Sequence, residues 1–167
     1  MISQKIIFSK EECLLILDQA SLWVNNKGYL ESGVDNWNYD RINQESHIKT
    51  DNIKDMVIKN LSEFNVIDIP EVIKLLKYNK GGYFGRHKDN GWNFPDRRIT
   101  VLIQLSENTS YKGGEMLVEN TSFQKDIGNT IVFDSNCYHE LKVIEEGVRY
   151  AAVLWLGTKH LLKSSLF

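Results

Sequence analysis

The sequence predicts an α+β, mainly β protein: a double-stranded β-helix (jelly roll, cupin-like) with N-terminal helices packed on one sheet. Two observations predict this fold. Before Pro70, apolar residues recur at helical spacing in two segments; after Pro70, short apolar runs alternate with Gly and Asn. Many short strands at such spacing are typical of a sandwich or barrel, and not of alternating strands and helices.

Two helices are expected in the N-terminal part, residues 1–70. The first begins after Ser9, where Glu12 completes a capping box, and its apolar spacing continues to about Trp23. The second covers about 53–64, where apolar residues again recur at helical spacing. Both are short enough to lie across one face of a sheet.

Strands are expected throughout the jelly-roll core, residues 71–157. A double-sheet jelly roll has eight strands, and the core offers that number of apolar runs. No internal repeat or linker interrupts the chain, so we expect a single domain over 1–167. The candidate strands are 72–78, 84–89, 98–105, 115–119, 122–125, 130–134, 139–144 and 148–156.

Composition is that of an ordinary globular protein, with 42% hydrophobic and 25% charged residues. The net charge of −2 gives no general attraction to nucleic acid or to an acidic membrane. No apolar stretch is long enough for a signal peptide or a membrane span. We therefore expect a cytoplasmic protein that binds neither nucleic acid nor membrane; the sequence does not predict its oligomeric state.

Two histidines and an aspartate have the spacing of a metal site. His87 and Asp89 are two residues apart, and on a strand such residues point to the same side. His139 lies in a later strand. Two histidines and one carboxylate on one face of an octahedral metal leave three positions open, as in non-haem Fe(II) oxygenases. The alternatives are a surface ion pair for His87 and Asp89, and a core histidine for His139.

Arg149 follows His139 by ten positions and lies in a strand that is apolar on both sides. Burying an arginine is costly unless an anion meets it, so we expect an anion near its guanidinium. The alternative is a structural salt bridge to Glu140, Glu145 or Glu146.

The strand 98–105 has one continuous apolar face and one mixed face. The mixed face carries Thr100, Leu102 and Gln104. Buried Thr and Gln side chains need hydrogen-bond partners, and a bound polar cofactor would supply them.

Residues 78–155 resemble the catalytic core of the iron(II)/2-oxoglutarate-dependent dioxygenases, and more narrowly their prolyl 4-hydroxylase-like branch. The resemblance covers about half of the chain, and its motifs occur in the family's order. They are Tyr78-x-x-Gly81, Tyr83-Phe84, His87-x-Asp89, Arg97 and Thr100, Gly113-Gly114-Glu115, Gly128, His139, Gly147-x-Arg149 and Trp155.

The resemblance implies that the catalytic metal is Fe(II), held by His87, Asp89 and His139. It implies that Arg149 binds the distal carboxylate of 2-oxoglutarate, with O₂ as cosubstrate and ascorbate as a further candidate cofactor. The cofactor slot would be lined by Tyr78, Thr100, Leu102 and Gln104. Gln104 departs from the tyrosine of many relatives, but an amide can still donate a hydrogen bond to a carboxylate.

The implied reaction is hydroxylation of an unactivated C–H bond, coupled to decarboxylation of 2-oxoglutarate to succinate. A peptidyl residue, with proline as the implied choice, is the first substrate hypothesis. The alternatives are a free amino acid or small metabolite, and a catalytically silent metal-binding jelly roll that serves as an interaction module. A nucleic-acid demethylase is disfavoured, because Trp155 occupies the position where those relatives have a second arginine.

Substrate contacts are expected from the loop 90–96, which leaves the metal-bearing strand and carries Trp92 and Phe94. Exposed aromatic residues at the mouth of a site suggest a clamp or lid. The alternative for Trp92 is a hydrophobic plug folded back onto the protein. The polar segment 31–50, to which we assign no regular structure, is a candidate for a second flap.

Overall fold

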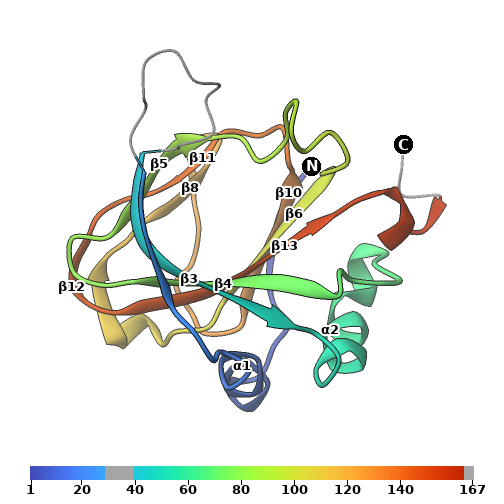
Figure 1. Ribbon diagram of the computed structural model, residues 1–167, viewed down its shortest axis with the longest axis horizontal. Helices are drawn as coiled ribbons and strands as arrows, with labels where there is room; N and C mark the ends of the chain where they lie inside the picture. The colour runs from blue at the N-terminus through green and yellow to red at the C-terminus, as the bar shows by residue number, and fades with distance from the viewer. Residues whose placement is uncertain (29–39, 164–167) are drawn as a thin grey trace.

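The computed structural model describes residues 1–28 and 40–163 (Figure 1). Within these ranges strands predominate, as predicted. The elements are β1 (Ile2–Ile6), α1 (Lys10–Leu17), β2 (Val24–Gly28), β3 (Arg41–Lys49), α2 (Lys54–Leu61), η1 (Ser62–Phe64), β4 (Val72–Tyr78), β5 (Tyr83–His87), β6 (Ile99–Gln104), η2 (Asn108–Ser110), β7 (Tyr111–Gly113), β8 (Met116–Val118), β9 (Thr121–Ser122), β10 (Asn129–Asp134), β11 (His139–Leu141), β12 (Ile144–Gly147), β13 (Arg149–Leu156) and η3 (Thr158–His160).

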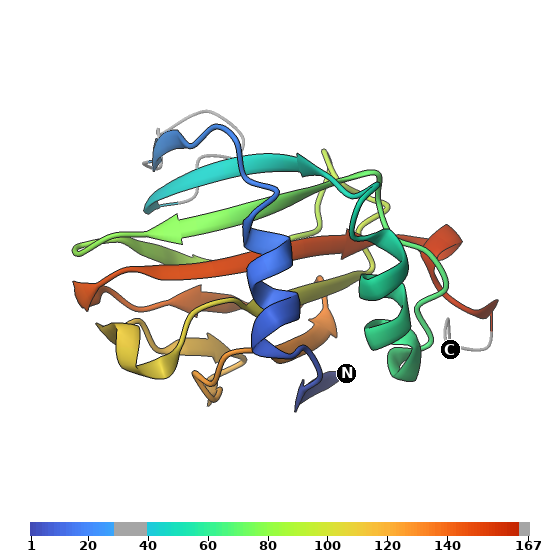
Figure 2. The ribbon, with the colours of Figure 1, turned by 90° about the horizontal axis from the view of Figure 1, so that it is seen from below.

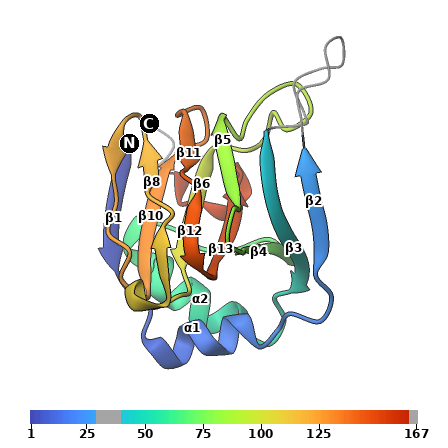
Figure 3. The ribbon, with the colours of Figure 1, turned by 90° about the vertical axis from the view of Figure 1, so that its left-hand side faces the viewer.

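One antiparallel sheet, 11-stranded within the described ranges, curls around the interior in the order β1-β10-β6-β13-β4-β3-β5-β11-β8-β9, with β2 added to β3. The curl passes through β3, which pairs with β4 from Gln44 to Lys49 and with β5 at Arg41 and Ile42. Strands β7 and β12 form a separate pair. Figure 3 shows β1 and β10 at one side of the molecule, and β2 and β3 at the other. The sheet therefore surrounds a space into which its concave face points.

The central strands are apolar on both faces because each face has its own core. In β6, Val101 and Ile103 face the outer core, while Leu102 between them faces the inner core. In β13, Leu154 joins the outer core and Val153 the inner core in the same way. The outer core holds the sheet together, so the inner face can carry polar groups.

The two α-helices lie across the outer face of the sheet (Figure 2), as predicted. The capping box is confirmed: the Ser9 hydroxyl accepts from the Glu12 amide, and the Glu12 carboxylate accepts from the Ser9 amide. Helix α1 buries Cys13 and Ile16, and α2 contributes fully buried residues to the same core. None of the helices in the described residues has the length and apolarity needed to cross a membrane.

The predicted first helix is too long at its C-terminal end. The observed helix α1 ends at Leu17. The apolar residues after Leu17 do not extend the buried face of α1, since Leu22 is 69% exposed. The chain from Val24 instead forms β2, which pairs with β3. The apolar spacing beyond Leu17 therefore predicted helical turns that the chain does not form, because the chain leaves the helix there and continues toward β2.

The prediction of a helical N-terminal part, residues 1–70, is incomplete, because this part also contains strands, one of them in the segment 31–50 to which no regular structure was assigned. Strand β3 occupies Arg41–Lys49, and β1 and β2 add two further strands. The inner face of β3 is polar, so its sequence lacks the apolar alternation that marks a strand. As a strand, 41–49 is not a flap; the rest of that hypothesis falls on 31–39, outside the described residues. The predicted strand 139–144 is also divided, into β11 and the start of β12.

Gly128 should be the glycine least tolerant of a side chain. Its φ is +83°, and a Cβ there would lie 1.9 Å from the Phe8 carbonyl oxygen. We expect Gly128→Ala to lower the free energy of unfolding by more than about 3 kcal/mol, because the clash adds to the cost of the left-handed conformation. Urea denaturation measures the loss.

Gly81 offers a matched control, since its φ is +85° but nothing lies within 4 Å of its added Cβ. Gly81→Ala should therefore lose only about 1–2 kcal/mol. Equal losses for the two variants would show that the contact with Phe8 does not constrain the backbone.

Candidate active site

His87, Asp89 and His139 converge inside the curled sheet. His87 ends β5, His139 begins β11, and the two residues are register partners. The Nε2 atom of His87 lies 3.4 Å from Asp89 Oδ1, and Nε2 of His139 lies 3.3 Å from Asp89 Oδ2. One ligand atom from each residue fits within 4.8 Å, and all three residues are buried. The convergence rules out a surface ion pair.

Both imidazole rings are held by backbone carbonyls. His87 Nδ1 lies 2.7 Å from the carbonyl oxygen of Gly85, and His139 Nδ1 lies 3.1 Å from that of Cys137. A proton on Nδ1 donates to each carbonyl, while Nε2 of each ring points to Asp89 and becomes the metal-binding atom when it carries no proton. This is the usual way in which a protein fixes the tautomer of a metal-binding histidine.

The electrostatics favour the protonation states that a metal requires. Burial lowers the pKa of His87, which favours the neutral ring. Burial alone would raise the pKa of Asp89, but the charge of His139 and hydrogen bonds from both histidines hold it well below its usual value. Adjacent ligands of an octahedral ion about 2.1 Å from the metal lie about 3 Å apart, close to the separations seen here. The three residues fit Fe(II) in donor type and spacing.

Asp89 is also held from outside the triad. The Thr100 hydroxyl donates to Asp89 Oδ2 at 2.8 Å and lies 2.9 Å from the Ser135 hydroxyl. The Asp89 amide donates to the Ser135 carbonyl at 3.0 Å. Sequence reasoning missed Ser135, because a serine in a turn carries no signal of its own. The structure brings Thr100 to the metal-binding carboxylate.

Arg149 is 4% exposed and lies at the start of β13, opposite Tyr78 of β4. Its Nε donates to Gln104 Oε1 at 3.2 Å, and Gln104 Nε2 donates to the Tyr111 hydroxyl at 2.8 Å. Tyr111 was not predicted; it comes from β7, whose position only the folded sheet determines.

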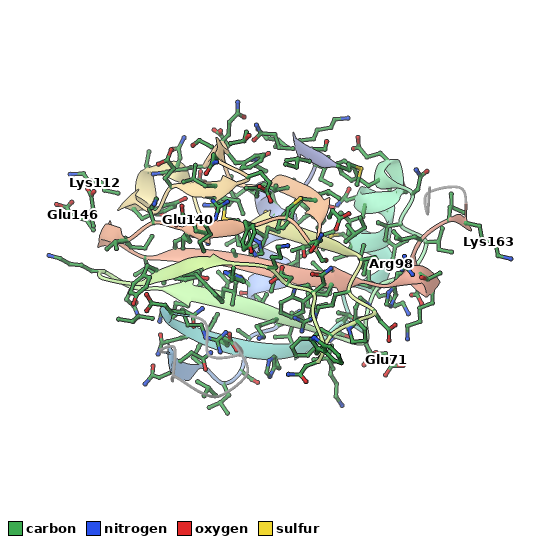
Figure 4. All side chains as sticks on the ribbon, turned by 90° about the horizontal axis from the view of Figure 1, so that it is seen from above. Glu71, Arg98, Lys112, Glu140, Glu146 and Lys163 are labelled. Carbon is green, nitrogen blue, oxygen red and sulfur yellow. The ribbon has the colours of Figure 1, made fainter. Side chains whose placement is uncertain are left out.

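No carboxylate of residues 1–28 and 40–163 forms an ion pair with Arg149. Glu140 pairs with Lys142, and Glu146 pairs with Lys112. Figure 4 shows Lys112 and Glu146 together at one end of the molecule. The salt-bridge alternative for Arg149 is therefore wrong, and a buried cation is left that an anion would stabilise.

A cavity of about 240 Å³ connects the triad with Arg149. Tyr78 and Leu102 line it, whereas Thr100 and Gln104 contact Asp89 and Arg149 instead of the cavity. Phe84 stacks on His87 with ring centroids 3.9 Å apart. The cavity is large enough for a small dicarboxylate, and its wall includes both the triad and Arg149.

Three charged residues of the cavity wall were missed by sequence reasoning: Arg41, Glu45 and Lys74. Glu45 lies 3.3 Å from Arg41 and 3.1 Å from Lys74. Alternate residues on β3 point inward, but no pattern in a polar segment indicates which set does so.

The loop after Asp89 lies at the mouth of the cavity. Trp92 is 97% exposed, so it is not a plug. Phe94 lines the cavity, and the Arg97 guanidinium lies 3.6 Å from the ring centroids of both Phe94 and Trp155. Cys137 contributes a backbone carbonyl to His139, and its thiol is not part of the triad.

Comparisons with known proteins agree with this geometry. The family profile of the 2OG-Fe(II) oxygenase superfamily matches residues 73–157, about half of the chain. A PKHD-type hydroxylase of Gloeothece citriformis is 28% identical over 116 residues, which cover 64% of this chain and 53% of that protein. One from Pseudomonas putida is 33% identical over 89 residues, covering 47% and 39%. The chain thus spans about half the length, or less, of these relatives.

Solved structures share the fold at low sequence identity. A Pseudomonas putida prolyl-4-hydroxylase has a TM-score of 0.66 at 14% identity, covering 93% of this chain and 91% of that chain. A Trichoplax adhaerens prolyl hydroxylase, in complex with a hypoxia inducible factor peptide fragment, has a TM-score of 0.63 at 23% identity, covering 95% and 83%. The jelly-roll prediction is confirmed. Together with the profile match, which includes the whole triad and Arg149, this shows that the chain belongs to the 2OG-Fe(II) oxygenase superfamily.

Proposed function

We propose that this protein is a single-domain Fe(II)- and 2-oxoglutarate-dependent dioxygenase that hydroxylates an unactivated C–H bond. One observation carries the proposal: a buried two-histidine, one-carboxylate triad and a buried arginine without an acidic partner among the described residues line one cavity. A metal-binding module would need the triad alone. The arginine adds a site for a dicarboxylate.

In this proposal His87, Asp89 and His139 hold Fe(II), and Arg149 holds the distal carboxylate of 2-oxoglutarate. When bound, these groups would supply the oxidising chemistry. 2-Oxoglutarate is converted to succinate and CO₂, one oxygen atom of O₂ enters succinate, and the other enters the substrate. The protein orients the reactants. Gln104 fixes one edge of the guanidinium, and the fork geometry of arginine suits a carboxylate.

Apolar side chains form part of the cavity wall, among them Leu102, Met116 and Val153. The exposed Trp92 and the half-exposed Phe94 extend toward incoming substrate.

For the substrate we propose a peptidyl residue, with proline as the first candidate. Support comes from the relatives named as prolyl hydroxylases, one of them in complex with a peptide, and from the aromatic loop at the mouth. A free amino acid is the second candidate, favoured by the charged side chains that line the cavity wall. The net charge of −2 gives no general attraction to nucleic acid or acidic membranes, and we propose that the enzyme binds neither. A cytoplasmic location is part of the same proposal.

The decisive experiment is incubation of the protein with Fe(II), 2-oxoglutarate, ascorbate and a panel of peptides and amino acids. We expect succinate to form and one substrate to gain a single oxygen atom, as detected by mass spectrometry. His87→Ala should abolish both, because two ligands cannot hold the metal in place. Succinate formation at the parent rate by His87→Ala would contradict the ligand assignment.

Arg149→Ala should raise the 2-oxoglutarate concentration required for half-maximal succinate formation by at least ~30-fold, because it removes a buried charge-assisted contact. The iron requirement should change little. Arg98→Ala serves as the control, because Arg98 is exposed and is not part of the cavity wall. If iron and 2-oxoglutarate requirements rose equally in a folded variant, Arg149 would have a structural role.

Thr100→Val keeps the shape of the side chain and removes its hydrogen bond to Asp89. We expect iron affinity to fall about ten-fold, as is usual when a partner of a metal ligand is removed. Competition with a chromophoric chelator measures it. Thr130→Val is the control: Thr130 is equally buried, but its hydroxyl bonds to the Gly128 carbonyl. The same fall in both variants would make the effect one of general packing.

A further inference from the structure

The cavity wall contains a second charged group that the cofactor and metal do not use. Glu45 is 8% exposed and lies between Arg41 and Lys74, at 3.3 and 3.1 Å. All three side chains line the same cavity as the triad. We call these three residues the Glu45 cluster.

The Glu45 cluster carries one more positive charge than negative charge. Its side chains are only 21%, 9% and 18% exposed for Arg41, Glu45 and Lys74. Burial lowers the pKa of Lys74, and the nearby arginines lower it further, while Glu45 alone opposes them. An excess buried cation is costly unless an anion balances it.

The Glu45 cluster is separate from the arginine assigned to 2-oxoglutarate. Along β13 the register partners are Arg149 with Tyr78 and Val153 with Lys74. The four-residue step places Lys74 about 13 Å further along the sheet. The positive charge of Lys74 is therefore available to a different ligand.

The Glu45 cluster also lies at the metal end of the cavity. Lys74 Nζ is 5.1 Å from the centre of the Trp155 ring, and Trp155 is the register partner of Thr100, which bonds to Asp89. On the other side, the Arg41 guanidinium lies 5.3 Å from the Phe84 ring, which stacks on His87. A molecule positioned for oxidation at the metal would contact this cluster.

We infer that the Glu45 cluster is a specificity site for a carboxylate carried by the substrate, bound through Lys74 and Arg41. Glu45 holds the two cations in position and limits their excess charge to one, which a single carboxylate neutralises. The inference rests on the proposed function, because it takes the molecule near the metal to be the substrate. The carboxylate has two possible sources: a free amino acid, or an acidic residue next to the target residue of a peptide.

Binding can be measured without turnover in protein loaded with redox-silent Zn(II) and 2-oxoglutarate. The chain has four tryptophans, and the indole N–H signal of Trp155, assigned with Trp155→Phe, reports on a ligand near Lys74. The probes are two matched pairs: L-proline with L-prolinamide, and a blocked Ala-Pro-Glu peptide with its Ala-Pro-Gln counterpart. We expect an acid to shift this signal and its amide to bind at least ~10-fold more weakly. The pair that responds identifies the source of the carboxylate.

Lys74→Gln should weaken binding of that acid at least ~10-fold and leave the amide unchanged. The melting temperature without ligand should not fall, since a balanced Arg41–Glu45 pair remains. Lys77→Gln is the matched control, because Lys77 lies on the same strand but stacks on Trp23 and Tyr150 of the outer face. Glu45→Gln provides the opposite change: it adds one net positive charge and should strengthen acid binding.

Three results would overturn the inference: acids and amides that bind equally, no binding by either acid, or an equal effect of Lys74→Gln and Lys77→Gln. Succinate formation from 2-oxoglutarate, measured separately, tests the proposed function. A protein that forms succinate but does not distinguish acid from amide would retain its function and lose this specificity site.

Discussion

The inner side of the curled sheet buries two charged groups, Asp89 and Arg149, without an oppositely charged lysine, arginine, aspartate or glutamate beside them among the described residues. The organisation of the site depends on these two charges. Asp89 is a buried carboxylate that two histidines and a hydroxyl hold in position, and no lysine or arginine of the described residues forms an ion pair with it. Arg149 is a buried cation that meets an amide and a tyrosine ring, and no carboxylate among the described residues. Each arrangement becomes favourable when a metal ion and a dicarboxylate are bound.

The sheet can tolerate this interior because its stability comes from the other face. Helices α1 and α2 and the outer rows of β4, β6 and β13 form one continuous apolar core. The inner core is smaller and packs around the ligand cavity, with Leu102 and Val153 beside the polar groups. Because the outer core stabilises the fold, the polar residues of the inner face can be arranged for binding. Their positions on rigid strands favour a preorganised site.

The site is also defined by what holds its ligands in place. Backbone carbonyls fix both imidazoles, and Thr100 and Ser135 fix Asp89. The Arg97 guanidinium lies between two aromatic rings and donates to the Asp89 carbonyl at 3.3 Å, which connects the loop at the mouth to the metal ligand.

Sequence alone determined the residues whose position follows from local periodicity. The two-residue spacing of His87 and Asp89 predicted two side chains on one side of a strand. The structure brings them together although β5 ends at His87, because the Asp89 amide donates to the Ser135 carbonyl just beyond it. The mixed face of 98–105 identified the groups that needed partners. The position of Arg149 in an apolar strand likewise indicated an anion nearby, because a buried cation is costly without one. The strands β4, β6, β10 and β13 were predictable because burial on both faces gives them continuous apolar runs.

Only the tertiary structure decided which polar residues face the cavity. Strand β3 was missed because a strand that lines a polar site has no apolar alternation. Arg41 and Glu45 lie on this strand and were missed for the same reason. Tyr111 and Ser135 reach the site through the closure of the sheet, a long-range event that no short segment encodes. Periodicity records which side chains avoid water; it does not record which polar side chains meet one another across a curled sheet.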